Sequence, residues 1–276
     1  MPDATVTYLV HNEIFIVRLE TASRRVEQIE SWRLPENGTR VTYAGLTCGR
    51  DGTVLLHRSQ LNHQRSGVYS ELITADICSR TIQAIPESMG LTWPVLSPSG
   101  HWIAASGTIQ PYRGVHSIVV FSTMTGERRT FTYERDAAAH AWEDTDAALL
   151  LTALSSSKGG LDTIQLDLNS GSFAYLAPGG RAVRSGQTGL LATISSDQRS
   201  IEVRDLAGAV RCCFRCPLFR DIAQWIDRDR LLYTSAVAPY RDTLGIADVE
   251  TGKLHKYVLP SHGEISGASF QIRPAA

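Results

Sequence analysis

The alternation of apolar and polar residues between Leu91 and Tyr133 predicts four short β-strands. Three apolar runs of strand length, VLS, WIAAS and SIVVF, precede a more polar run, RRTFTY. Ser-Pro-Ser-Gly separates the first two runs and Thr-Gly-Glu the last two, and both segments contain the residue types of tight turns. The connection in the middle, residues 107–116, is longer. We therefore expect one unit of four strands, joined by a tight turn, a longer loop and a second tight turn.

This four-strand unit recurs along the chain. Its clearest marker is an acidic or hydroxyl residue that ends a strand and is followed by a small polar turn. The markers are Glu20, Asp76, Ser122, Asp167, Asp205 and Asp248. Their spacing is 38 to 56 residues, and turn residues before the second strand recur in the same phase in five units. Repeats of about 40–50 residues with four strands each are typical of β-propeller blades.

Six copies predict an all-β fold, a six-bladed β-propeller of four-stranded antiparallel blades, with five or seven blades as the alternative. The chain begins with three strands that lack a first strand and ends with one strand that lacks followers. We therefore expect the C-terminal strand to pair with the N-terminal three and close the ring as one domain, 1–276. The expected blades are 1–36 plus 263–276, 37–88, 89–134, 135–178, 179–218 and 219–262.

Several motifs resemble those of a known propeller family. LSPSGHWIAAS, at residues 96–106, is similar to the S-P-D-G-x-x-I/L-A-F signature of TolB-type and related WD-repeat-like propellers. Residues 122–127 and 248–253 resemble the D-x-x-T-G-E turn of that family, with Ser replacing Asp in the first and Lys replacing Glu in the second. Trp142 and Trp225 stand where the family often has the W of W-S-P-D-G. The resemblance implies a fold and no particular activity, because propellers have many functions.

Composition and charge narrow the function classes. The chain has 27 basic and 28 acidic residues and a net charge of −1, whereas a nucleic-acid-binding domain usually has a basic excess. No run approaches 18 uncharged apolar residues, so we expect no membrane partner. The N-terminal MPDATVTYLV lacks the pattern of a secretory signal, and five cysteines is an odd number. Both features favour a cytoplasmic location with reduced thiols.

Three of the cysteines cluster as Cys212, Cys213 and Cys216, which includes a C-x-x-C spacing. A structural zinc site needs four ligands, and the sequence has no second C-x-x-C and no H-x-x-x-H. In a strand, positions 213 and 216 point to opposite faces. We therefore expect structural thiols and neither a metal nor another cofactor.

The connections between the second and third strands are long in four blades, at residues 60–70, 107–116, 155–160 and 236–243. In a propeller these connections share one face, and functional residues are often carried by loops on a rigid scaffold. Pro-Tyr-Arg occurs in two of them, and Tyr and Arg are enriched at binding hot spots. The candidate partner-binding residues are Tyr112, Arg113, Tyr240 and Arg241, surrounded by His63, Arg65, Tyr69 and His116. The alternative is ordinary loop composition, with packed tyrosines and solvated arginines.

The sequence gives weaker support for catalysis than for partner binding. The sequence has no G-x-S-x-G nucleophile elbow. The best titratable cluster is His140, Glu143, Asp144 and Asp146, in which His140 could act as a base with Glu143 as its partner. The structural interpretation places Trp142 in the blade core and the acids in a turn, and the equivalent run at 225–229 favours it.

We therefore expect a non-catalytic propeller whose long-loop face binds a protein. An inhibitor or bacterial immunity protein that neutralises a toxin is a narrower hypothesis from the architecture. The alternative is an enzyme of hydrolase or lyase type with its site at the mouth of the central channel. A third interpretation is a structural ring within a larger assembly.

Overall fold

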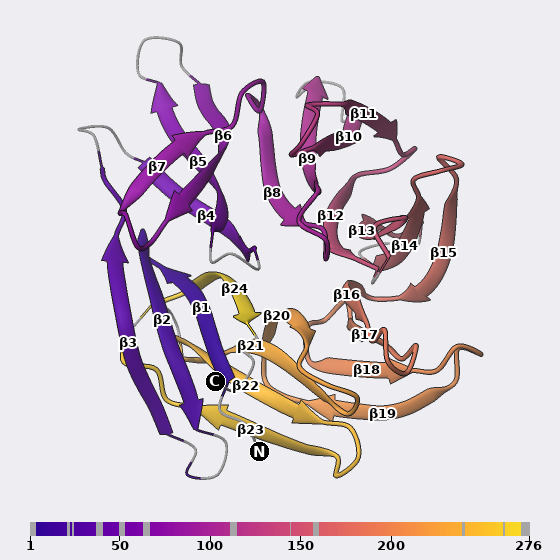
Figure 1. Ribbon diagram of the computed structural model, residues 1–276. Coiled ribbons are helices and arrows are strands. Elements are labelled where there is room, and N and C mark those ends of the chain that lie inside the picture. The colour runs from indigo at the N-terminus through magenta and orange to yellow at the C-terminus, as the bar shows by residue number, and fades with distance from the viewer. Residues whose placement is uncertain are drawn as a thin grey trace.

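The computed structural model describes residues 4–20, 23, 25–36, 41–49, 53–62, 67–110, 115–143, 145–156, 160–238, 241–261 and 263–271. These residues form six four-stranded antiparallel sheets arranged around a common centre, as Figure 1 shows. The expected six-bladed β-propeller is therefore confirmed. Among the described residues, no helix has the length and apolar character needed to cross a membrane.

Every blade has four strands that follow one another from the centre of the ring to its rim. From the innermost strand outward, blade 1 contains β24 (Ile265–Gln271), β1 (Ala4–Val10), β2 (Glu13–Glu20) and β3 (Arg25–Arg33). Blade 2 contains β4 (Val41–Cys48), β5 (Val54–Asn62), β6 (Gly67–Asp76) and β7 (Thr81–Ala84). Blade 3 contains β8 (Leu91–Leu96), β9 (Trp102–Gln110), β10 (Val115–Ser122) and β11 (Arg128–Thr132).

The other three blades follow the same order. Blade 4 contains β12 (Ala137–Trp142), β13 (Ala148–Leu154), β14 (Leu161–Asp167) and β15 (Phe173–Pro178). Blade 5 contains β16 (Gly180–Arg184), β17 (Leu191–Ile194), β18 (Ser200–Arg204) and β19 (Val210–Arg215), so the shortest blade retains four strands. Blade 6 contains β20 (Phe219–Trp225), β21 (Arg230–Ala238), β22 (Arg241–Asp248) and β23 (Lys253–Tyr257).

Blade 1 is shared by the two ends of the chain. Strand β24 pairs antiparallel with β1, from Thr5 opposite Gln271 to Val10 opposite Ile265. This pairing confirms the expected closure by the C-terminal strand. Closure pairs the inner edge of β1, which would otherwise expose unpaired backbone groups.

The recurring marker residue has a local structural role. The Asp167 Oδ1 atom accepts hydrogen bonds from the backbone N–H groups of Asn169 and Ser170, at 2.9 and 2.8 Å. The Ser122 Oγ atom accepts the equivalent bonds from residues two and three ahead, at 3.2 and 3.1 Å. A short side-chain acceptor is what such a turn requires, which explains why Ser can replace Asp in this repeat.

The tryptophans that match the family signature join neighbouring blades. Trp142, the last residue of β12, donates from its indole N–H to the carbonyl oxygen of Val95 in blade 3, at 3.0 Å. Trp225, the last residue of β20, makes the same bond to Val183 in blade 5, at 3.2 Å. Each indole therefore satisfies a carbonyl on the inner strand of the preceding blade while its ring packs against the core.

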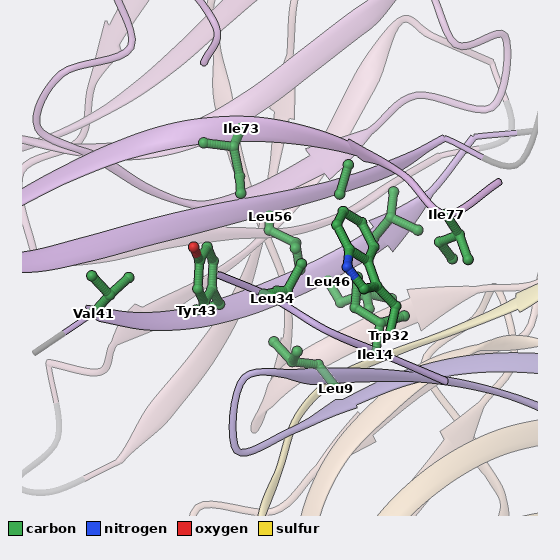
Figure 2. Close-up of a cluster of buried hydrophobic side chains, with 12 residues drawn as sticks. Leu9, Ile14, Trp32, Leu34, Val41, Tyr43, Leu46, Leu56, Ile73 and Ile77 are labelled. Carbon is green, nitrogen blue, oxygen red and sulfur yellow. The ribbon is translucent and has the colours of Figure 1, made fainter. Parts of the chain in front are cut away.

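Apolar clusters fill the interfaces between blades, and they differ in size. The cluster between blades 1 and 2 holds twelve buried residues, including Trp32, Tyr43 and Leu56 (Figure 2). The cluster between blades 4 and 5 holds four buried residues, which are Leu150, Ala177, Ala182 and Leu191. The ring is thus packed unevenly around its circumference.

Candidate functional site

The two faces of the ring differ in the height of their hairpins. We call the face with the β5–β6, β9–β10, β13–β14 and β21–β22 connections and the links between blades the long-hairpin face. The opposite face, which carries the turns from first to second and from third to fourth strands, is the short-turn face. This division follows from the strand order in every blade.

The hairpin of blade 3 rises above its inner strand. In β8, Leu91 pairs with Gly107 of β9, but β9 continues for three more residues until Gln110 pairs with Val115. The β21–β22 hairpin of blade 6 also extends three residues past its last pair with the inner strand. In blade 5, by contrast, β17 ends at Ile194, the residue that pairs with the start of its inner strand. At about 3.3 Å per residue, the tall hairpins stand roughly 10 Å above the ring.

The sequence-based boundaries of three long loops are therefore wrong. Much of 60–70, 107–116 and 236–243 is paired strand, and in blade 6 Ala238 pairs directly with Arg241. Turn-type residues inside these segments favoured loops in the sequence, whereas the strands continue up to them in the structure. Tyr69, His116 and Arg241 consequently belong to strands.

Three of the eight candidate partner-binding residues lie in the part of the chain that the structure describes. Arg241 is exposed at the start of β22. Tyr69 is half-buried on β6, and its hydroxyl donates to the Glu71 carboxylate at 3.5 Å. His116 belongs to β10. The five other candidates, Tyr112, Arg113, Tyr240, His63 and Arg65, lie outside the described residues.

Arginines paired with buried carboxylates recur beneath the long-hairpin face in alternate blades. In each pair the acid is almost fully buried and the guanidinium is partly exposed. The pairs are Arg58–Glu71 in blade 2, Arg135–Asp162 in blade 4 and Arg220–Asp242 in blade 6. A buried carboxylate fixes the guanidinium plane, and further protein groups hold two of the three arginines: Arg135 also donates to the Leu154 carbonyl and the Tyr133 hydroxyl, and Arg220 to Glu264.

Asp242 also anchors the closure of the ring. Its Oδ2 atom accepts from the backbone N–H of Ile265 at 2.9 Å, and its own N–H donates to the Gly263 carbonyl at 2.9 Å. Arg220 bridges this acid to Glu264, at 3.4 and 3.1 Å. The exposed Arg241 therefore stands next to one of the most constrained positions on the face.

The innermost strands of the blades share a β-bulge or similar irregularity. Each of the six has a register shift against the second strand of its blade. In β12 the displaced residue is His140, between Ala139 and Ala141. Bulges re-aim side chains, so residues at these positions depart from the regular alternation of their strand.

His140 joins the inner strands of two blades that are not neighbours in the ring. Its Nε2 atom lies 3.2 Å from the carbonyl oxygen of Ile222 and 3.5 Å from Asp221 Oδ1, both on β20. Strand β12 belongs to blade 4 and β20 to blade 6, so the contact bypasses blade 5. Burial lowers the pKa of His140, Asp221 opposes this shift, and Arg181 adds to it.

The pairing of His140 with Glu143 that the catalytic interpretation requires does not form. The Glu143 Oε1 atom instead accepts from Arg184 Nε at 2.9 Å and from Gln165 Nε2 at 3.4 Å. The bulge at position 140 turns the imidazole away from the turn that follows β12. Asp144 lies outside the described residues, and Asp146 accepts from the backbone N–H of Ser99 at 3.3 Å. The catalytic interpretation of this sequence cluster is therefore wrong in its pairing.

Solved structures with the same architecture were found despite low sequence identity. TolB from Acinetobacter baumannii aligns with a TM-score of 0.68 and 15% identity, over 97% of this chain and 66% of TolB. A chain of the nidogen/laminin complex aligns with a TM-score of 0.69 and 12% identity, over 97% and 98% of the two chains. A puromycin-hydrolyzing peptidase of Mycobacterium tuberculosis aligns with a TM-score of 0.55 and 14% identity, over 94% of this chain and 53% of the peptidase.

The chain shares the β-propeller fold of these structures. No protein family and no curated protein sequence matches it. At these identities the likeness concerns the fold alone, and the chain spans about half of the peptidase. The resemblance of the sequence motifs to TolB-type propellers is confirmed at this level.

Trp93 is an exposed aromatic residue of an inner strand that was not among the sequence-based candidates. It lies at the bulge of β8 with a φ of 52°, a backbone conformation that bulky residues rarely adopt, and its side chain is 49% exposed. Its backbone N–H donates to His57 Nδ1 at 3.2 Å, and the two rings meet edge to face. The only sequence signal was an aromatic residue before Pro94 inside a predicted strand.

The three cysteines that cluster in the sequence do not form a common site. Cys213 is exposed on β19, whereas Cys216 is buried beyond the end of that strand. In the part of the chain that the structure describes, no three His, Cys, Asp or Glu residues are grouped as metal ligands. All five cysteines are free thiols.

Proposed function

We propose that this protein is a non-catalytic binding module that grips a protein partner with its long-hairpin face. The observation that carries the proposal is the set of hairpins in blades 2, 3 and 6, which rise above inner strands that end lower. Raised hairpins on a rigid ring present side chains at fixed positions, and so reduce the ordering entropy lost on binding.

Side-chain chemistry on this face also suits a protein. Three exposed apolar residues lie on its links and hairpin ends, which are Met89, Leu154 and Val258. Exposed Arg241 and the partly exposed Arg58 and Arg220 add directional charge. Apolar contacts combined with oriented arginines are typical of protein interfaces. One structural neighbour comes from a complex between two proteins, nidogen and laminin, which supports the proposal by analogy.

A narrower form of the proposal makes the partner a toxin that this protein neutralises in the cytoplasm. Its support is the binding-face architecture and the near-zero net charge, which favours a partner without a strong basic surface. Co-expression with the captured partner tests it: a toxin's growth defect should be relieved by the wild-type propeller.

A charge reversal on each face of blade 6 tests the binding proposal. Arg241→Glu alters the long-hairpin face, and Arg228→Glu alters the short-turn face at a side chain that is 75% exposed. We expect a partner captured from the native host to lose at least tenfold in affinity with Arg241→Glu and to be unaffected by Arg228→Glu. Equal effects of the two variants, at unchanged melting temperature, would contradict the assignment of the face.

The channel favours a second candidate, a small-molecule site. His140, Asp221 and Arg181 form a titratable group there, and inner-strand bulges direct it. An anionic metabolite that raises the melting temperature of the wild type, but not of a His140→Gln variant, would support this candidate.

A further inference from the structure

Blade 6 contains a buried hydroxyl that no protein group satisfies. Tyr233 is 0% exposed, and its OH has no hydrogen-bond partner among the described residues. Its register partner on β22 is Gly245, and a Cβ at that position would clash with the phenol ring. The ring therefore lies over the glycine, because only a residue without a side chain leaves that space.

The next register partner in this series across blade 6 is a lysine. Gly245 pairs with Lys256 on β23, so Tyr233, Gly245 and Lys256 stand side by side on one face of the sheet. Lys256 Nζ donates to the Sγ atom of Cys216 at 3.5 Å. Cys216 also acts electrostatically on Tyr233, whose pKa is raised mainly by burial. An ammonium group thus contacts the Cys216 thiol, and Tyr233 belongs to the same buried cluster as this cysteine.

This thiol borders a pocket between the β17–β18 turn and the link from blade 5 to blade 6. The pocket measures about 520 Å³ and is lined by Asp197, Arg199, Ser200, Arg215, Cys216 and Pro217. Within the described part of the chain, neither arginine forms an ion pair. Two arginines therefore face one carboxylate in the pocket wall, and Lys256 adds a third cation beside Cys216, so the pocket attracts anions.

We propose that Cys216 is a modifiable thiol that reacts with small anionic disulfides, of which glutathione disulfide is the physiological type. Cys216 is 7% exposed and forms part of the pocket wall, so a reagent reaches it through the pocket. The arginines bind the carboxylates of the reagent, and Lys256 stabilises the thiolate.

The reaction is an ordinary thiol–disulfide exchange. Cys216 releases its proton to solvent, and its thiolate attacks one sulfur of the reagent. A bond forms between Cys216 Sγ and that sulfur, the disulfide bond of the reagent breaks, and the departing thiolate takes a proton from water. The reagent is reduced to one equivalent of thiol as the protein becomes a mixed disulfide. The added group would stand at the interface of blades 5 and 6, beside the long-hairpin face.

The test compares a dianionic aromatic disulfide, 5,5′-dithiobis(2-nitrobenzoate), with neutral 2,2′-dithiodipyridine on the full chain. Peptide mass mapping assigns rates to individual cysteines, and exposed Cys78 in blade 2 serves as the internal reference. We expect Cys216 to prefer the dianionic reagent about tenfold more strongly than Cys78 does, from the charge of the nearby arginines. Glutathione disulfide should add one glutathionyl group at Cys216.

Two variants separate the roles of the cations. Arg199→Gln combined with Arg215→Gln should remove the preference for the dianion, about tenfold, and leave the rate with the neutral reagent unchanged. Lys256→Met should slow both reagents alike, because it removes the cation beside the thiolate. An unmodified Cys216 in the folded protein, or a charge preference that survives loss of both arginines, would overturn the proposal.

Discussion

The blade 1–2 interface and the blade 4–5 interface both join neighbouring blades, but they do so with different kinds of side-chain contact. Between blades 1 and 2, aromatic and branched side chains interlock in a twelve-residue apolar cluster, with Trp32 and Tyr43 beside Leu56 (Figure 2). Between blades 4 and 5, the apolar cluster has four members, and two of them are alanines. The ring nevertheless closes through both interfaces.

Polar contacts span the thinner interface. Arg184 of blade 5 pairs with Glu143 at the end of blade 4, at 2.9 Å. The backbone N–H of Arg181 donates to Thr152 Oγ1 at 2.6 Å. Further along, the N–H of Leu161 donates to Ser196 Oγ at 2.8 Å. The small residues at this interface allow the two backbones to approach closely enough for these bonds.

The difference shows that a propeller interface can depend either on the burial of apolar side chains or on the geometry of polar contacts. An apolar interface loses stability in proportion to the cavity that a truncation leaves. A polar interface loses stability when one partner is left buried without the other. The two interfaces should therefore fail under different substitutions.

The largest expected effect comes from the same truncation at both interfaces. Leu56 and Leu150 are each 0% exposed, and each lies on the second strand of its blade. Leu56→Ala should lower the free energy of unfolding by about 4 kcal/mol and Leu150→Ala by about 2.5 kcal/mol, because the larger cluster loses more packing contacts. Denaturant unfolding of both variants measures the difference. Equal losses would show that the sizes of the two clusters have no energetic consequence.

Much of this architecture could be predicted from sequence because it depends on local turn chemistry. The marker acids and hydroxyls accept turn N–H groups, so their recurrence gave the blade count. The hairpin extensions could not be predicted, because each adds only two or three residues to a strand next to turn-type residues, too few for a strand pattern in the sequence. The contact of His140 could not be predicted either, because Asp221 lies 81 residues away on another blade and only the curvature of the ring brings the two together.

The second test removes the acid of the polar interface. Glu143→Ala leaves the Arg184 guanidinium mostly buried, with its remaining bond to the Gly189 carbonyl at 3.4 Å. We expect a loss of about 2 kcal/mol in unfolding free energy. Combining Glu143→Leu with Arg184→Met should recover most of that loss, since neither charge remains. If the double variant is no more stable than Glu143→Ala, the ion pair does more for the interface than neutralise two buried charges.

The smallest effect concerns the close approach itself. An added Cβ at Gly180 would lie 2.5 Å from Thr152 Cγ2, and Gly180 has no positive φ that would add strain. Gly180→Ala should therefore cost about 1–2 kcal/mol by pushing blade 5 away from blade 4. Thr152→Ser removes the clashing methyl and keeps the Oγ atom that accepts from Arg181. In that background Gly180→Ala should have nearly no effect, because relief of the clash and the reduced entropy of the unfolded chain act together. A loss of the same size in both backgrounds would mean that the steric contact with Thr152 does not set the spacing of the two blades.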